Sequence, residues 1–113
     1  MDRIQRKRTK GFKLPPNTVC VNRGTRFGNP FPVGEIFTRE EAVRLFRLCL
    51  NCPSYVYALF EKDRCKEMEI YFRNMREHLK DLKGVDYIAC FCKEGELCHG
   101  DVIIEETKKI NKD

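Results

Sequence analysis

The stretch VDYIACFC, residues 85–92, decides the fold of this chain. Its last six residues, from Tyr87 to Cys92, are apolar or nearly so, and they do not alternate cleanly with polar residues. A strand with that pattern has both of its faces covered, as the central strands of parallel sheets do. We therefore expect residues 85–92 to form the central strand of a parallel sheet.

Two segments before this strand have clear local patterns. Residues 18–21 are a short β-branched run after the turn residues 15–17, which predicts a second strand. Thr38 and Glu41 have the spacing of a helix capping box, and apolar residues at helical spacing follow as far as Leu50. The first clear helix is therefore expected to begin at Thr38.

Two further helical segments complete the pattern. Residues 54–82 are expected to be helical, with an amphipathic stripe made of Met68, Phe72, Met75, Leu79 and Leu82. Residues 100–110 predict a short final helix with Ile103 and Ile110 facing inward. Residues 3–8 alternate weakly and suggest an additional edge strand.

The order of these elements is strand, helices, strand, helix. It predicts a single small three-layer α/β domain over residues 1–113, with a mostly parallel sheet and flanking helices. No apolar run has the length of a membrane span, and no signal-peptide pattern is present, so we expect a soluble cytoplasmic protein without a membrane partner. The oligomeric state does not follow from these patterns.

The chain has seven cysteines, an odd number without a repeating spacing. In a reducing compartment they are expected to be free thiols, and most should be small buried apolar residues. We expect this role for Cys20, Cys49, Cys52 and Cys65.

Positive charge is concentrated at the N-terminus. Residues 1–13 hold six basic residues and one acidic residue, a sum of +5, which equals the net charge of the whole chain. A basic segment of this kind suggests an anionic partner such as a phosphate, a nucleotide or a nucleic acid. A solvated tail is the alternative interpretation.

A polar loop follows each of the two well-defined strands: NRGTRFGNPFPVG at residues 22–34 and CFCKEGELCHGD at residues 90–101. Because parallel strands end at one edge of a sheet, the two loops should meet there. The first loop carries arginines and glycines, which suit phosphate oxygens. The final helix begins near Cys98 and aims its free N–H groups at the same edge, which also favours an anion.

The second loop leaves three interpretations open. Cys90, Cys92, Cys98 and His99 are zinc-ligand types, but the C-x-C spacing and the adjacent Cys-His pair are poor, so no metal or cofactor is expected. In the second interpretation Cys98 is a nucleophile, because the N-terminus of a helix stabilises a thiolate. Cys98 is then expected to be the fastest-reacting thiol, with His99 and Asp101 as its neighbours. In the third interpretation these residues only shape and cap a turn.

Three motifs together resemble a known family. They are RTKGF at residues 8–12, FGNPF at 27–31 and CFC…CHGDV at 90–102. This combination resembles a family of small uncharacterised α/β proteins of bacteriophages and bacteria, whose members favour tryptophan where this chain has Phe12, Phe27 and Phe91. Relative to that family, residues 52–66 look like a helical expansion. The resemblance implies a phage or prophage origin but no activity.

We therefore expect a protein that binds a nucleotide or a nucleotide-derived small molecule. It would either sequester a signalling nucleotide or cleave an N-glycosidic bond, and the residues do not distinguish binding from turnover. The expected ligand contacts are Arg8, Lys10, Phe12, Arg23, Arg26, Phe27, Gly28 and Asn29, and the expected catalytic residues are Cys98, His99 and Asp101. The alternatives are a nucleic-acid-binding accessory protein that uses the basic N-terminus and a zinc-stabilised interaction module.

Overall fold

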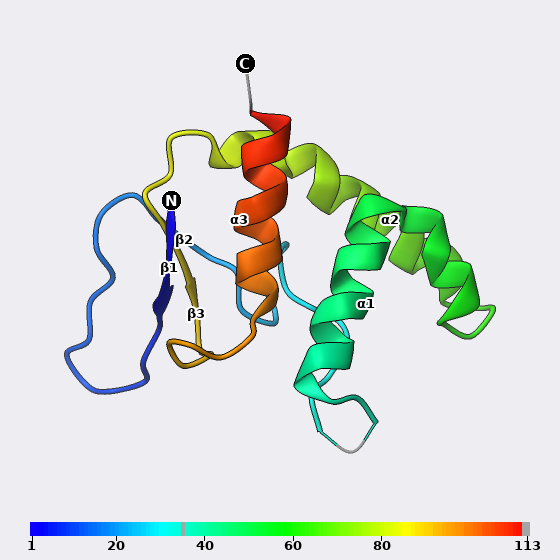
Figure 1. Ribbon diagram of the computed structural model, residues 1–113, viewed down its shortest axis with the longest axis horizontal. Coiled ribbons are helices and arrows are strands. Elements are labelled where there is room, and N and C mark those ends of the chain that lie inside the picture. Colours follow the sequence, from blue (N-terminus) through cyan, green and yellow to red (C-terminus); the bar gives the residue numbers. More distant parts are fainter. Residues whose placement is uncertain (35, 112–113) are drawn as a thin grey trace.

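The computed structural model describes residues 1–34 and 36–111. Its centre is a three-stranded parallel sheet of β1 (Asp2–Gln5), β2 (Thr18–Cys20) and β3 (Tyr87–Cys90), in the order β1-β3-β2 (Figure 1). Tyr87 pairs with Asp2 on one side and with Thr18 on the other. The predicted central strand and the weak edge strand are both confirmed, although β3 ends two residues earlier than expected.

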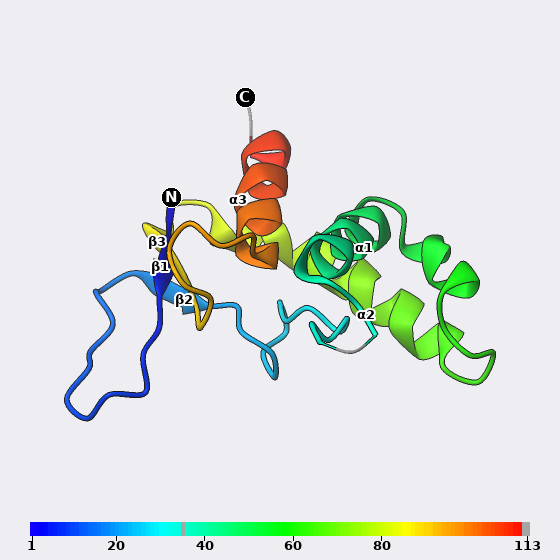
Figure 2. The same cartoon turned by 60° about the horizontal axis from the view of Figure 1, so that its bottom comes forward.

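Helical segments flank the sheet, which confirms the predicted α/β class. They are α1 (Arg39–Asn51), η1 (Pro53–Ala58), α2 (Cys65–His78), η2 (Leu79–Leu82) and α3 (His99–Ile110). The α3 helix packs against β1 and β3, while α1, η1 and α2 pack on one another beside the sheet (Figures 1 and 2). No helix within residues 1–34 and 36–111 combines the length and apolarity needed to cross a bilayer.

The capping box at the start of α1 forms as predicted. Thr38 Oγ1 accepts a hydrogen bond from the Glu41 N–H at 3.1 Å, and Glu41 Oε1 accepts one from the Thr38 N–H at 2.9 Å. These bonds satisfy backbone donors that have no partner within the helix. The Thr38 N–H also lowers the pKa of the Glu41 carboxyl group.

The helical region expected over residues 54–82 is interrupted at 59–64. At this break the chain turns, and the Phe60 ring packs on Phe31 with 5.4 Å between the ring centroids. The expected region is therefore helical over most of its length, but it consists of separate segments. The amphipathic stripe is confirmed, because Met68, Phe72, Met75, Leu79 and Leu82 are all buried.

Two burial expectations are corrected. Ile110 is 39% exposed because the last turn of α3 extends beyond the sheet (Figure 1). Cys52 is exposed because it follows the end of α1, whereas Cys49 and Cys65 are buried and Cys20 is half-buried.

The loop after β2 is anchored to α2 by one tyrosine. The Tyr71 hydroxyl donates a hydrogen bond to the Gly28 carbonyl at 2.6 Å and lies 3.4 Å from the Thr25 carbonyl. The loop is tight at this point, since a Cβ on Gly28 would lie 3.0 Å from the Arg23 Cα. Tyr71 therefore fixes the loop that begins with Asn22 and Arg23.

We expect Tyr71→Phe to lower the free energy of unfolding by about 1 kcal/mol, because it leaves the Gly28 carbonyl without its short hydrogen bond. Tyr57→Phe is the matched control, since the Tyr57 hydroxyl makes only a 3.4 Å contact at an exposed site. Chemical denaturation of both variants measures the difference. Equal stabilities would show that the hydroxyl does not hold the loop.

Candidate functional site

A cleft of about 190 Å³ opens at the carboxyl edge of β2 and β3. The loop after β2 and the loop after β3 both contribute to its wall, as the parallel topology predicts. The first residues of α1 form another part. The lining residues are Asn22, Arg23, Asn29, Phe31, Val33, Arg39, Val43, Cys90, Phe91, Cys92, Leu97, Cys98 and His99.

The loop between β3 and α3 is held by Arg3 of β1. Arg3 Nη2 donates to the Glu96 carbonyl at 2.8 Å, and Nη1 lies 3.4 Å from both the Cys92 and the Lys93 carbonyls. Arg3 Nε donates to the Asp101 carboxylate at 3.0 Å. Sequence reasoning missed Arg3 because it counted this residue only as part of a basic segment.

Asp101 is consequently occupied by Arg3, and it does not line the cleft. Its carboxylate joins the first turn of α3 to β1, two segments that are 98 residues apart in the chain. Asp101 therefore orients the start of α3 relative to β1.

His99 lines the cleft but is 6% exposed. Its Nε2 donates to the Val21 carbonyl at 2.5 Å, and its ring packs edge-on against Phe46 at a centroid distance of 5.1 Å. Burial lowers the pKa of His99, because the charged imidazolium loses its hydration. A carbonyl oxygen can only accept a hydrogen bond, so the neutral ring carries its proton on Nε2. Nδ1 is then an acceptor, and it lies 3.8 Å from Cys98 Sγ.

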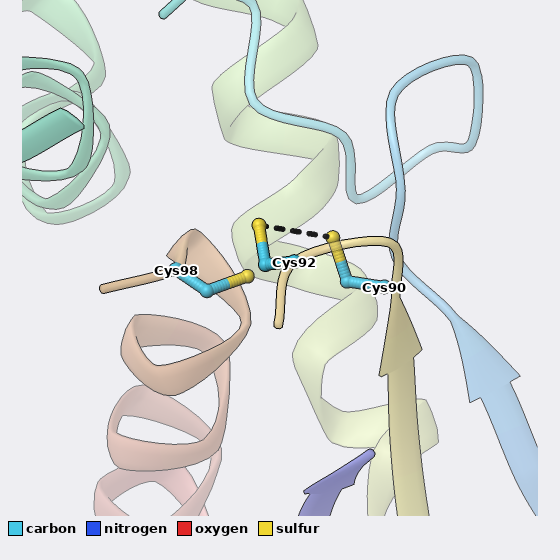
Figure 3. A group of neighbouring side chains, drawn as sticks. All are labelled: Cys90, Cys92 and Cys98. Atoms are coloured by element: carbon cyan, nitrogen blue, oxygen red, sulfur yellow. Dashed lines mark hydrogen bonds between the residues drawn. The ribbon is translucent and has the colours of Figure 1, made fainter. Parts of the chain in front are cut away.

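Three thiols gather at one side of the cleft. The Sγ atoms of Cys90, Cys92 and Cys98 all lie within 4.8 Å of one another, and those of Cys90 and Cys92 are 3.8 Å apart (Figure 3). Cys90 is the last residue of β3, Cys92 lies in the loop that follows, and Cys98 is the N-cap of α3, where its Sγ accepts from the Gly100 N–H at 3.4 Å. Arg39 Nη1 donates to the Cys92 sulfur, also at 3.4 Å.

The spacing along the chain was therefore a poor guide to this cluster. The loop turns through Gly95, which has a φ of 82°, and brings Cys98 back beside the end of β3. The cysteines supply three soft metal ligands that the C-x-C spacing did not indicate.

The thiols of Cys90 and Cys98 influence each other. The Cys98 S–H stabilises the Cys90 thiolate by hydrogen bonding and so lowers the pKa of Cys90. The same interaction, together with burial, raises the pKa of Cys98. Cys98 is also only 2% exposed. We therefore no longer expect Cys98 to be the fastest-reacting thiol, although it does sit at a helix N-terminus.

The predicted contacts from the loop after β2 divide into two groups. Arg23 and Asn29 line the cleft. The Asn29 side chain is nevertheless engaged, because Nδ2 donates to the Ala42 carbonyl at 3.1 Å and Oδ1 accepts from the Phe31 N–H at 2.9 Å. The Phe27 side chain is buried in the core and cannot stack on a ligand in the cleft.

The remaining predicted contacts lie outside the cleft lining. Gly28 is buried in the loop, and Arg26 is exposed. Lys10 and Phe12 are exposed in the loop between β1 and β2. Arg8 lies with its guanidinium 4.2 Å from the centroid of the Phe91 ring.

Two arginines from other parts of the chain contact residues of the cleft lining, and the sequence analysis did not predict this. Arg6 also stacks near Phe91, at 5.3 Å, and its Nη1 donates to the Asn22 side chain at 3.2 Å. Arg39, the first residue of α1, donates to the Leu97 carbonyl at 3.2 Å. No local pattern marks an arginine at the start of a helix as part of a cleft, so only the tertiary structure reveals these contacts.

The fold and the cleft define a small α/β domain with a cleft at the carboxyl edge of a parallel sheet. Residues 4–109 match the family described as Domain of unknown function (DUF4326), and the chain therefore belongs to that family. No curated protein and no solved structure matches the chain. Its function must therefore be argued from the site.

We expect limited alkylation of the native protein to label Cys52 first, because this thiol is exposed. Burial raises the pKa of Cys49 to about 11, so that thiol should react slowly, and Cys98 should be protected by its burial. Peptide mass spectrometry after short exposure to iodoacetamide measures the order. Alkylation in denaturant is the control, and labelling of Cys98 before Cys52 would contradict the expectation.

Proposed function

We propose that this protein binds a nucleotide or a nucleotide-derived small molecule in the cleft between the two loops. The observation that carries the proposal is one cleft that combines arginine side chains with an apolar wall at the carboxyl edge of parallel strands. Ligands of open α/β sheets bind at this edge. A nucleotide has the matching halves, a charged phosphate and a flat apolar ring.

Arginine supplies the anion-binding half. Arg23 is exposed beside the cleft, and within residues 1–34 and 36–111 its guanidinium has no hydrogen-bond or ion-pair partner. Arg39 is partly occupied, since its Nη2 lies 3.5 Å from the Glu96 carboxylate. Arg23 is therefore the residue best placed to take a phosphate, through paired N–H donors.

The apolar half comes from three segments. Phe31 and Val33 belong to the first loop, Val43 belongs to α1, and Phe91 and Leu97 belong to the second loop. Bases stack on aromatic rings and on guanidinium planes, and Phe91 already lies against arginine. The cleft volume of about 190 Å³ is below the 300–1,000 Å³ typical of sites for drug-sized ligands, so the cleft would enclose one half of a nucleotide, the base or the sugar phosphate, and the other half would lie at its mouth.

The side chains favour sequestration over N-glycosidic cleavage. Glycoside hydrolysis ordinarily needs a carboxylate at the reacting bond, and none of the described residues that line the cleft is a carboxylate. Asp101 is paired with Arg3, and His99 is held by the Val21 carbonyl. Binding without turnover is therefore the form of the proposal that we favour.

Arg23→Ala should weaken the binding of phosphorylated ligands by about 10- to 100-fold, the value of a charge-assisted hydrogen bond. Nucleosides without phosphate should lose little affinity. Arg44→Ala is the matched control, since Arg44 is exposed on α1 and does not line the cleft. Native mass spectrometry and calorimetry with nucleosides and their monophosphates measure the effect. No binding to wild type, or equal loss in both variants, would contradict the proposal.

A second candidate function is nucleic-acid binding through the loop between β1 and β2. Lys7, Arg8, Lys10 and Lys13 are all exposed there, and Phe12 is 38% exposed among them (the loop extends away from the helices in Figures 1 and 2). Exposed cations with an interleaved aromatic ring suit a single strand.

The salt dependence of binding separates this candidate from the first. If four cations engage phosphates of a single strand, the logarithm of the affinity should fall against the logarithm of salt concentration with a slope of about −3. Lys7→Ala/Lys10→Ala should reduce that slope and leave mononucleotide binding unchanged. Fluorescence anisotropy with a labelled oligonucleotide measures the slope, and a flat profile would exclude this candidate.

A further inference from the structure

We infer that Cys90, Cys92 and Cys98 bind a zinc ion, with the fourth coordination position open to the cleft. The three sulfurs come from the end of β3, the loop after it and the N-cap of α3, and they lie within 4.8 Å of one another. Within residues 1–34 and 36–111 they are the one cluster of three or more metal-ligand side chains with this proximity. This inference is independent of the nucleotide proposal, since the metal is measured without any other ligand.

The distances between the sulfurs fit a tetrahedral zinc site. Zn–S bonds of about 2.3 Å at tetrahedral angles place two sulfurs about 3.8 Å apart. Cys90 and Cys92 already have their Sγ atoms 3.8 Å apart. Figure 3 shows the Cys98 side chain pointing from the start of α3 toward these two residues. Small side-chain rotations would therefore complete the site.

The ligand type selects the metal. Thiolate sulfur is a soft ligand that suits zinc, whereas magnesium and calcium require oxygen. The expectation of no metal rested on the C-x-C spacing and on the adjacent Cys-His pair, and both describe distance along the chain and not distance between sulfurs. The zinc interpretation of the sequence considered Cys90, Cys92, Cys98 and His99, and the three sulfurs of this set are the ones that lie close together.

The surroundings suit the charge of the loaded site. When Zn²⁺ binds, three thiols release three protons to solvent, and the resulting centre carries a net charge of −1. Arg39 donates to the Cys92 sulfur at 3.4 Å, and the Gly100 N–H donates to the Cys98 sulfur at 3.4 Å. The Arg3 side chain packs against Gly100 and bonds the Cys92 carbonyl. Such outer contacts orient metal ligands and stabilise their charge.

The fourth position is not assigned to His99. Its Nδ1 lies 3.8 Å from Cys98 Sγ, but His99 does not belong to the cluster in which all ligand atoms are mutually close. Its Nε2 is fixed by the Val21 carbonyl, which restricts the ring. Three protein ligands and one exchangeable position are the pattern of zinc sites that bind water or substrate. All three cysteines line the cleft, so an anion there can reach the metal.

The test uses the full-length chain. Elemental analysis after expression in zinc-supplemented medium should find about one zinc per chain. Replacement by Co²⁺ should give an absorption spectrum with sulfur-to-cobalt charge transfer from three thiolates and the intense d–d bands of tetrahedral cobalt. Addition of inorganic phosphate should shift the d–d bands, because the fourth ligand exchanges.

Variants assign the ligands. Cys90→Ser, Cys92→Ser and Cys98→Ser should each weaken Co²⁺ binding by more than about 100-fold, above the loss of an outer-shell contact. Cys52→Ser, at an exposed thiol away from the cluster, is the control and should bind like wild type. If a cluster variant fails to fold, the wild-type cobalt spectrum still counts the thiolates.

Several results would overturn the inference. These are a wild-type chain that binds no metal after reconstitution, iron or copper in place of zinc, fewer than three thiolates on cobalt, or unchanged affinity in the three cluster variants. A d–d spectrum insensitive to phosphate would overturn the open position. Arg23→Ala should retain its zinc, so failure of the nucleotide proposal and failure of the zinc site can be told apart.

Discussion

The parallel pairing of β3 with a strand on each side is the constraint on which the rest of the structure depends. β1 and β2 are both parallel to β3, so the chain leaves β2 and β3 at the same edge. Arg23 and Cys92, distant in sequence, therefore line one cleft. If β2 ran antiparallel, its following loop would lie at the opposite edge, and neither the cleft nor its mixture of arginines and thiols would exist.

Two long-range side-chain contacts then fix the geometry of this edge. Arg3 joins β1 to the loop after β3 and to Asp101 of α3, while His99 joins the start of α3 to the backbone after β2. Polar residues near a sheet edge are commonly interpreted as catalytic, but here the Asp101 carboxylate is paired with Arg3, and His99 Nε2 is bonded to the Val21 carbonyl. Burial lowers the pKa of His99, because the charged ring would lose its hydration, and this effect outweighs the opposite effect of its hydrogen bond to the Val21 carbonyl.

The cleft lining places positively charged arginines close to the sulfur atoms of three cysteines. Arginine lies at its edge, thiols lie on one wall, and its described lining contains no carboxylate. An exchangeable position on a thiolate-bound metal would take a ligand with a lone pair, and because that centre carries a net charge of −1, the arginine beside it would supply the attraction for an anion. The two proposals thus agree on ligand charge, although each rests on different residues.

The sequence by itself determined the α/β class, the central strand, the capping box of Thr38 and Glu41, and the meeting of two loops. These follow from local hydrogen bonding, hydrophobic periodicity and the direction of parallel strands. Only the tertiary structure decided that Asn29 is engaged by backbone groups, that Asp101 pairs with Arg3, and that three cysteines converge. The physical reason is that a side chain's partner depends on how a loop turns in space, as at Gly95, and the spacing of residues along the chain does not contain that distance.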